Sequence, residues 1–164
     1  MVYTRYMNVQ IESLTEKTKY EARDLVVKAD IGPSLRVIKF FNKSLRQQHN
    51  NIFLAMVDDH IVGIIGWYID DGHWAGKSLG KLFPYGNDIY WVSYFAVIEE
   101  YRGKGIGKIL MEKLFGEMKK KHAKVLWVYT RKARGFYEKM GFQFVTRTHI
   151  ESCDHDFLKY EIGG

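Results

Sequence analysis

One segment constrains the fold of this chain more than any other: a β-prone run that leads through a glycine-rich turn into an amphipathic helix. Residues 89–97 (IYWVSYFAV) are rich in aromatic and β-branched side chains and predict a strand. Glycines follow at alternate positions, Gly103, Gly105 and Gly107. The apolar residues from Gly105 onward recur at helical spacing and predict a helix. They are Ile106, Ile109, Leu110, Leu114 and Met118, with Phe115 beside them.

A strand that enters such a turn before a helix directs several backbone N–H groups, and the positive end of the helix, at one point. That point attracts phosphate. Glycines have no Cβ atom to keep an anion at a distance, and they permit positive φ angles. Arg102, Lys104 and Lys108 add positive charge. On the glycines alone, a turn without a ligand is an equally good interpretation, because a short glycine pattern is a weak signal.

Two common nucleotide-binding loops do not fit this segment. The Walker pattern GxxxxGK[ST] fails because Lys108 is followed by Ile109 instead of Ser or Thr. The dinucleotide pattern GxGxxG fails because the three glycines alternate and no later glycine completes the spacing. The sequence therefore disfavours both of the folds that carry these loops.

The order of the other predicted elements indicates an α+β or mixed α/β protein, a sheet with helices packed on it. Thr15 is the predicted cap of a first helix, on which Tyr20, Leu25 and Val26 face the core. A second helix, 35–46, carries Leu35, Ile38, Phe41 and Leu45 at helical spacing, and 133–140 is a short helix. Strands are predicted at 7–14, 52–57, 61–69, 124–129, 142–150 and 157–162, with a hairpin turn at Asp-Asp-His and a long loop at 70–88.

Composition indicates a single domain. At 164 residues and 46% hydrophobic content, the chain can bury one sizeable core and divides poorly into two. The longest apolar run, residues 61–69, is far shorter than the roughly 18 residues of a membrane span, and no secretory signal is evident. The lone Cys153 excludes an intrachain disulfide and a CxxC metal motif. We expect a soluble, cytoplasmic protein that does not bind membranes.

The formal net charge of +6 favours a polyanionic partner but does not distinguish nucleic acid, membrane or a phosphorylated cofactor. One basic cluster surrounds the glycines. A second, residues 119–124 (KKKHAK), suits the C-terminal turn of a helix, where cations are favoured. A third consists of Arg131, Lys132 and Arg134. Only the first cluster coincides with a predicted anion site.

Two motifs together resemble a known family. Arg102, Gly105 and Gly107 match the pattern RxxGxG, and residues 133–142 (ARGFYEKMGF) end in FYxxxGF. In this order, with a helix and a strand between them, they resemble the GCN5-related N-acetyltransferase (GNAT) family, strongly over residues 89–145 and more loosely before. The resemblance implies a single domain over residues 1–164. It also implies a mostly antiparallel, twisted sheet of six to seven strands with about four helices packed on both faces.

The resemblance also implies transfer of an acetyl group from acetyl-CoA to an amine of a small molecule or peptide. The amine attacks directly in a ternary complex, without a metal. The implied proton donor to the departing CoA thiolate is Tyr137, whose phenol is protonated at neutral pH. The implied cofactor site has two parts. The end of the strand, beside a bulge that separates two strands, pairs with the pantetheine arm. The amides of the loop that follows hold the pyrophosphate. The implied cofactor-binding residues are Phe95, Ala96 and Val97, then Arg102, Gly103, Lys104, Gly105, Ile106, Gly107 and Lys108.

Three parts of the site depart from the family pattern or stay open. Thr130 stands where many members have asparagine. The strand at 89–97 has no carboxylate to act as a general base, so water, or one of the loop residues Asp70, Asp71 and His73, is left for that role. We expect Glu99 and Glu100 to be solvated turn residues. The acceptor pocket would involve residues 29–34. The aromatics Trp67, Tyr68, Trp74, Tyr85 and Trp91 would line it or, more commonly for strand aromatics, fill the core.

Other interpretations remain. Residues 149–157 (HIESCDHDF) gather possible metal ligands, but their spacing matches no zinc pattern, so a polar loop is expected and no metal site. Phe136 is expected to be a core residue and Gly141 a left-handed helix cap. A CoA-binding sensor without catalysis and a nucleic-acid-binding domain are the alternatives to an enzyme, and a homodimer is left open.

Overall fold

The computed structural model describes residues 7–69, 88–150 and 152–163. The predicted long loop therefore lies, except for Asp88, outside the described residues. So do the base candidates Asp70, Asp71 and His73 and the aromatics Trp74 and Tyr85. No helix in the described ranges combines the length and apolarity that a membrane span requires.

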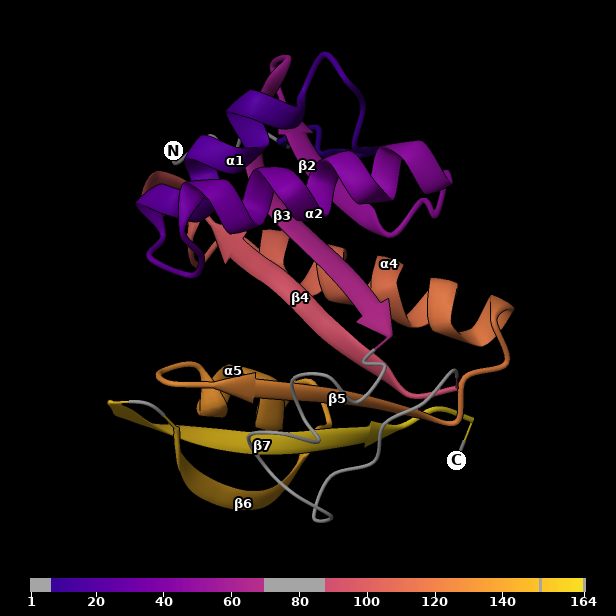
Figure 1. The fold of residues 1–164 in the computed structure, drawn as a ribbon, viewed down its shortest axis with the longest axis vertical. Coiled ribbons are helices and arrows are strands. Elements are labelled where there is room, and N and C mark those ends of the chain that lie inside the picture. The colour runs from indigo at the N-terminus through magenta and orange to yellow at the C-terminus, as the bar shows by residue number, and fades with distance from the viewer. Residues whose placement is uncertain (1–6, 70–87, 151, 164) are drawn as a thin grey trace, which may run out of the picture. The chain divides into compact units, whose positions relative to one another are not determined.

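The described strands form a seven-stranded mixed sheet in the order β1-β2-β3-β4-β5-β7-β6 (Figure 1). The ladders β1–β2, β2–β3, β5–β7 and β6–β7 are antiparallel, and β4–β5 is parallel. This confirms the predicted α+β fold with a mostly antiparallel sheet. The strands are β1 Gln10–Ser13, β2 Ile52–Val57, β3 His60–Ile69, β4 Tyr90–Val97, β5 Val125–Thr130, β6 Gln143–Ile150 and β7 Cys153–Glu161.

The part of the chain that is described contains four α-helices and one short 3-10 helix. The α-helices are α1 Lys19–Lys28, α2 Ser34–Gln47, α4 Ile106–Lys120 and α5 Arg134–Lys139, and the 3-10 helix is η2 Glu99–Tyr101. The β2–β3 hairpin turns at Asp58 and Asp59, whose φ angles of 49° and 62° are those of a two-residue type I′ turn.

Contacts between residues group the described chain into two compact units. The first consists of residues 7–66 and 94–110, and the second of residues 67–69, 88–93, 111–150 and 152–163. The strands β3 and β4 and the helix α4 contribute residues to both. The prediction of a single domain over residues 1–164 stays a prediction.

The first unit has helices on both faces of its strands. On one face, α1 and α2 lie side by side (Figure 1) and bury Val26 and Phe41 in one cluster with Leu54 of β2 and Ile64 of β3. On the other face, the start of α4 approaches β3 so closely that a Cβ atom on Gly63 would lie 2.9 Å from Leu110 and 3.3 Å from Ile106. Close packing of α4 on β3 therefore fixes the first turn of α4.

The second unit places different aromatic residues on the two faces of β5 and β7. Phe115 of α4 stacks on Tyr160 of β7 at 4.2 Å between ring centroids, and Phe142 packs beside them. The opposite face carries Trp91, Trp127, Tyr129 and Phe157 in one cluster. Of the aromatics considered for an acceptor pocket, Trp67 and Trp91 are buried and Tyr68 is partly buried, as expected for core residues.

Several details of the predicted helices are wrong. Leu35 is 75% exposed because the buried face of α2 contains Val37, Phe41 and Ser44, and the hydroxyl of Ser44 hydrogen-bonds to Asn51. A prediction that counts only apolar residues misses the buried Ser44 and therefore assigns the neighbouring face of α2 to the core. In α4 the buried face also differs from the prediction, because Met111 is buried and Ile109 is 37% exposed.

The first helix also begins later than predicted. Thr15 and Thr18 bond to one another, with the amide of Thr15 donating to Oγ1 of Thr18 at 3.0 Å and the amide of Thr18 donating to Oγ1 of Thr15 at 3.3 Å. The chain therefore makes an extra turn before α1 starts at Lys19, and Thr15 does not cap it. Leu25 and Val26 are buried as predicted, but Tyr20 is exposed.

Candidate functional site

Hydrogen bonds fix the segment between β4 and α4 as a tight turn, in which the amide of Tyr101 donates to the Ile98 carbonyl at 3.0 Å. The amide of Ile98 donates to the Val62 carbonyl at 2.9 Å, which holds the end of β4 beside β3. Arg102 donates from Nε to the Val97 carbonyl at 3.0 Å and from its amide to the Glu99 carbonyl at 3.1 Å. The amide of Arg102 is thus already used within the turn, and its guanidinium is the part that can meet an anion.

Two of the three glycines in this turn have backbone angles that only glycine adopts readily. The φ angle is 72° at Gly103 and 82° at Gly105, and a Cβ atom at either position would meet no atom within 4 Å. Gly107 differs from the prediction, because it lies in the first turn of α4 and has no positive φ. The contribution of Gly107 is that glycine places no Cβ atom beside the helix start. The turn therefore combines a left-handed backbone, which glycine adopts without strain, with open space at both positions.

The helix start behind this turn supplies the electrostatic component. The Gly105 carbonyl accepts the amide of Ile109 at 3.1 Å, so Gly105 is the N-cap and the amides of the first turn have no acceptor within the helix. Ile106 is fully buried and anchors that turn. Lys104 lies with Nζ 5.0 Å from the centre of the Tyr101 ring. Exposed basic side chains and the helix dipole therefore meet at Gly103–Gly105.

The strand β4 contains a kink at Tyr94. Its φ angle is 38°, in the left-handed region that the first residue of a glycine-type bulge adopts. Tyr90 pairs with Leu126 and Trp91 with Trp127, and along the described β4 the ladder to β5 ends there. The sequence did not reveal this kink, because a tyrosine inside a strand carries no turn signal. A bulge in β4 was expected only from the family resemblance.

Beyond the kink, Phe95, Ala96 and Val97 are partly buried. Successive strand residues direct their backbone groups to alternate sides. Because the Ile98 amide points toward β3, the backbone groups of Val97 point away from β3, where its carbonyl meets Arg102.

Tyr137 belongs to the second unit and lies on the short helix α5. Its side chain is 4% exposed and packs against Phe142, with 5.3 Å between the ring centroids, and against Phe136 at 5.6 Å. Burial raises the pKa of the Tyr137 phenol above its ordinary value, because the phenolate would lose its solvation. The side chain therefore stays protonated at neutral pH. Phe136 is partly buried, which fits the packing role expected for it.

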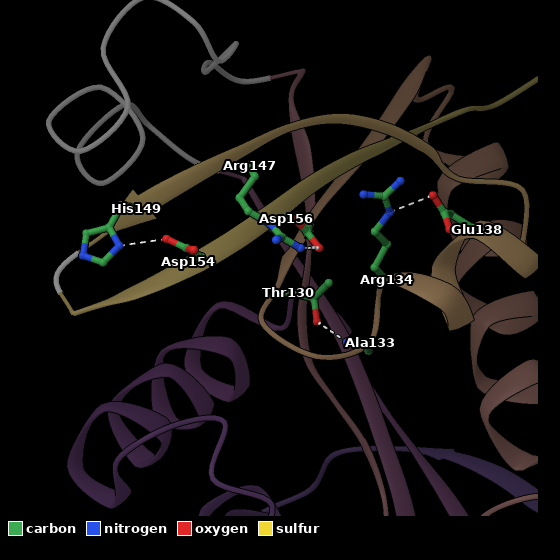
Figure 2. Close-up of polar contacts among 8 residues, drawn as sticks. All are labelled: Thr130, Ala133, Arg134, Glu138, Arg147, His149, Asp154 and Asp156. Carbon is green, nitrogen blue, oxygen red and sulfur yellow. Dashed lines mark hydrogen bonds and ion pairs between the residues drawn. The ribbon is translucent and has the colours of Figure 1, made fainter.

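Thr130 uses its hydroxyl locally. Figure 2 shows Oγ1 of Thr130 accepting the amide of Ala133, at 3.1 Å, across the turn from β5 into α5. The threonine thus supports the backbone that presents the helix of Tyr137. Gly141 ends the helix as predicted, with φ at 96°, and a Cβ atom there would lie 3.1 Å from Tyr160.

The described carboxylates of Glu99, Glu100 and Asp156 do not offer a general base. Glu99 and Glu100 are exposed on η2, as predicted. Asp156 is buried, but Arg147 binds it through Nε at 2.7 Å and Nη2 at 3.1 Å (Figure 2). Arg147 holds the pKa of Asp156 below its ordinary value, which makes that carboxylate a poor proton acceptor.

The segment 149–157 was predicted to be a loop, and this is wrong. It is the end of the β6–β7 hairpin, because Ile150 pairs with Cys153 and His149 with Asp154. Figure 2 shows Nδ1 of His149 bonded to Asp154 at 2.8 Å. Successive side chains of a strand point to opposite faces of the sheet, so the polar side chains of this segment are divided between two faces. Within the described ranges, no three His, Cys, Asp or Glu side chains are grouped so that they could hold a metal ion.

Comparison with known proteins places these observations in one family. The model of the acetyltransferase (GNAT) family matches residues 12–142. An N-alpha-acetyltransferase of Saccharolobus solfataricus is 34% identical over 111 residues, 65% of this chain and 64% of the relative. A [ribosomal protein bS18]-alanine N-acetyltransferase of Haemophilus influenzae is 42% identical over 53 residues, 30% of this chain and 36% of the relative. The chain thus matches less than two thirds of the length of either relative.

A solved structure shares the fold. The protein yncA from Salmonella typhimurium, solved with its cofactor acetyl-CoA, superposes with a TM-score of 0.71. It has 11% sequence identity and covers 96% of this chain and 95% of its own. At that identity, the likeness concerns the fold alone.

Proposed function

Because this chain belongs to the acetyltransferase (GNAT) family, we propose that it transfers the acetyl group of acetyl-CoA to an amine, most specifically the α-amine of a protein or peptide. The observation that carries this proposal is the turn at Gly103 and Gly105. It is the part of the RxxGxG motif where left-handed glycines, open space and a helix start coincide.

The proposed pyrophosphate site consists of the backbone amides from Gly103 to Lys108, with the Arg102 guanidinium beside them. Helix-start amides bind phosphate because they have no acceptor within the helix and lie at its positive end. The absence of Cβ atoms at Gly103 and Gly105 lets an anion come close to the backbone. Lys104 and Lys108 raise the local positive potential. ATP lacks the pantetheine arm that would pair with the strand residues 95–97 and should therefore bind more weakly.

The proposed pantetheine site is the backbone of Phe95, Ala96 and Val97. The amide and carbonyl groups of an extended arm can pair with the side of a strand as another strand would. The kink at Tyr94 supports this role, because the β4–β5 ladder ends at Trp91, before these residues.

Acetyl-CoA would supply an activated acetyl group as a thioester. The acceptor amine forms a bond to the carbonyl carbon, the carbon–sulfur bond breaks, and CoA leaves as a thiolate. Tyr137 is the proposed donor of the proton to that sulfur, because a tyrosine phenol is protonated at neutral pH. The described β4 strand carries no carboxylate, so the proton lost by the amine passes to water or to one of the loop residues Asp70, Asp71 and His73, and Tyr137 regains a proton from water.

The acceptor class is proposed from the relatives. One relative is named an N-alpha-acetyltransferase and the other is named for an alanine of ribosomal protein bS18, which favours a peptide α-amine over a small-molecule amine. Since this chain matches only part of each relative, the α-amine acceptor is a more specific proposal than acetyl transfer itself.

A calorimetric titration with acetyl-CoA, CoA and ATP, followed by thiol-release assays on peptides with free and with blocked α-amines, tests this function. We expect micromolar Kd values for both CoA forms, weak ATP binding, and thiol release only with free α-amines. Binding without thiol release for any amine would instead support the CoA-binding sensor. No binding of either CoA form would overturn the proposal.

A further inference from the structure

Tyr94 is a bulky residue in a backbone conformation that bulky residues rarely adopt. Its φ angle is 38°, and it lies within β4, where neighbouring residues are extended. A left-handed conformation at a non-glycine residue persists when the surrounding packing holds it. The contacts of the Tyr94 side chain therefore show what fixes the kink.

The Tyr94 ring is held by α2 and by the turn between α1 and α2. It lies edge-on to Phe40, with 5.4 Å between the ring centroids, and edge-on to Phe41 at 6.0 Å. A Cβ atom on Gly32 would lie 2.8 Å from Cε1 of Tyr94 and 2.9 Å from Cγ2 of Val37. Such distances are too short for two carbon atoms, so only glycine fits at this position without displacing the ring. The α1–α2 turn is thus packed directly against the residue that kinks β4.

The residues that follow Tyr94 depend on the direction in which the kink sends the chain. Phe95, Ala96 and Val97 come next, and the amide of Ile98 is then bonded to β3 at 2.9 Å. Only these three residues separate the kink from that fixed point. A displaced Tyr94 must therefore change where their backbone groups point.

We propose that Tyr94 is a positioning residue that joins the α1–α2 turn to the cofactor-binding strand, so that displacement of its ring at Gly32 weakens acetyl-CoA binding. This inference rests on the proposed function, because it concerns the backbone of Phe95–Val97 as an acetyl-CoA site. Tyr94 acts through that backbone and need not touch the cofactor. Packing changes in the α1–α2 turn are thereby transmitted to the cofactor strand.

The test is a double-mutant cycle on the Kd of acetyl-CoA, measured by calorimetry on folded protein well below the unfolding midpoint. Gly32→Ala pushes on the ring, and Tyr94→Gly removes the ring while still permitting the left-handed backbone. We expect Gly32→Ala to raise the Kd about tenfold, the equivalent of one lost hydrogen bond, when the ring is present. In the Tyr94→Gly background the same substitution should change the Kd less than about twofold.

Gly116→Ala in α4 is the matched control, since its new Cβ atom would meet nothing within 4 Å, and it should leave the Kd unchanged. If Gly32→Ala does not fold, Phe40→Leu replaces it, because it removes the nearest aromatic partner of the ring. The inference alone is overturned if wild-type protein binds acetyl-CoA but the substitution has no effect, or has the same effect with and without the Tyr94 ring. Failure of the wild-type protein to bind acetyl-CoA overturns the proposed function, and this inference with it.

Discussion

The turns before α4 and after α5 both place glycine in the left-handed region, and they differ in what surrounds the glycine. At Gly103 and Gly105, before α4, an added Cβ atom would meet no atom within 4 Å. At Gly141, after α5, it would lie 3.1 Å from the ring of Tyr160, which is itself stacked on Phe115. Both turns need glycine for the same backbone reason, but only the second also needs it for packing.

The two turns also use their amides differently. After α5, the amide of Gly141 donates to the Glu138 carbonyl at 3.0 Å and the amide of Phe142 to the Tyr137 carbonyl at 3.0 Å, so this turn is closed within the chain. Before α4, the turn leads into a helix start, whose amides lack intrahelical acceptors. A glycine motif therefore indicates an anion site only where open space and a helix start accompany it. The predictions below test this difference, from the largest expected effect to the smallest.

Gly105→Asp should abolish acetyl-CoA binding, with a rise in Kd of more than about 1000-fold, because it adds both a side chain and a negative charge beside the helix start. Calorimetric titration of the folded variant measures this change. Gly116→Asp places the same side chain on an exposed position of α4 and should keep wild-type affinity. Equal loss in both variants would mean that net charge, and not the turn, governs binding.

Tyr137→Phe should lower kcat by roughly 100-fold and leave the Kd of acetyl-CoA nearly unchanged, since the hydroxyl acts only on the departing thiolate. Steady-state thiol release and calorimetry measure the two quantities. Phe136→Leu, a change of a neighbouring packing residue on α5, serves as the control and should affect kcat far less. Unaltered turnover in Tyr137→Phe would remove this residue from the mechanism.

Gly141→Ala should reduce the free energy of unfolding by about 2 kcal/mol, because alanine opposes the left-handed backbone and its Cβ crowds Tyr160. Urea unfolding followed by circular dichroism gives this value, and the acetyl-CoA Kd of the folded variant should not change. Gly135→Ala, on the exposed side of the same helix with nothing within 4 Å, should be neutral or slightly stabilising. Weaker cofactor binding in Gly141→Ala would erase the proposed difference between the turns.

The Arg147–Asp156 pair should give the second unit a small acid sensitivity. Arg147 lowers the pKa of Asp156 in the folded state, so the pair stabilises the fold at pH values above those at which carboxyl groups ordinarily titrate. This contribution is lost as the pH falls through the lowered pKa. Urea midpoints between about pH 5 and pH 3 should fall less steeply in Arg147→Gln than in the wild type. Parallel slopes in the two proteins would show that the pair contributes no pH dependence.

Local sequence patterns predicted the elements well because strong periodicity and turn residues specify them. The β2–β3 hairpin, β4 and the helix α4 all follow from such patterns. Details that depend on tertiary contacts were not predictable. Leu35 was assigned to the core because nothing in the sequence indicates that Ser44 is buried and bonded to Asn51.

Motifs in the sequence predicted the glycine turn and Tyr137 as parts of the site, and their roles stay predictions. The positive φ angles at Gly103 and Gly105 agree with the backbone geometry predicted for that turn. The kink at Tyr94 and the tight fit of Gly32 could not be found, because they arise from packing between segments about 60 residues apart in the sequence. Residues 149–157 were assigned to a loop because polar composition conceals a strand whose side chains form cross-strand pairs.

The most direct test of the central claim is a titration with acetyl-CoA followed in the ¹H–¹⁵N NMR spectrum of the assigned protein. The account predicts that the amide signals of Gly103, Gly105 and Ile106 shift strongly and saturate together, while that of Gly141 changes little. Saturating shifts at Gly141 with none at Gly103 and Gly105, or no saturable shift at either turn, would contradict it.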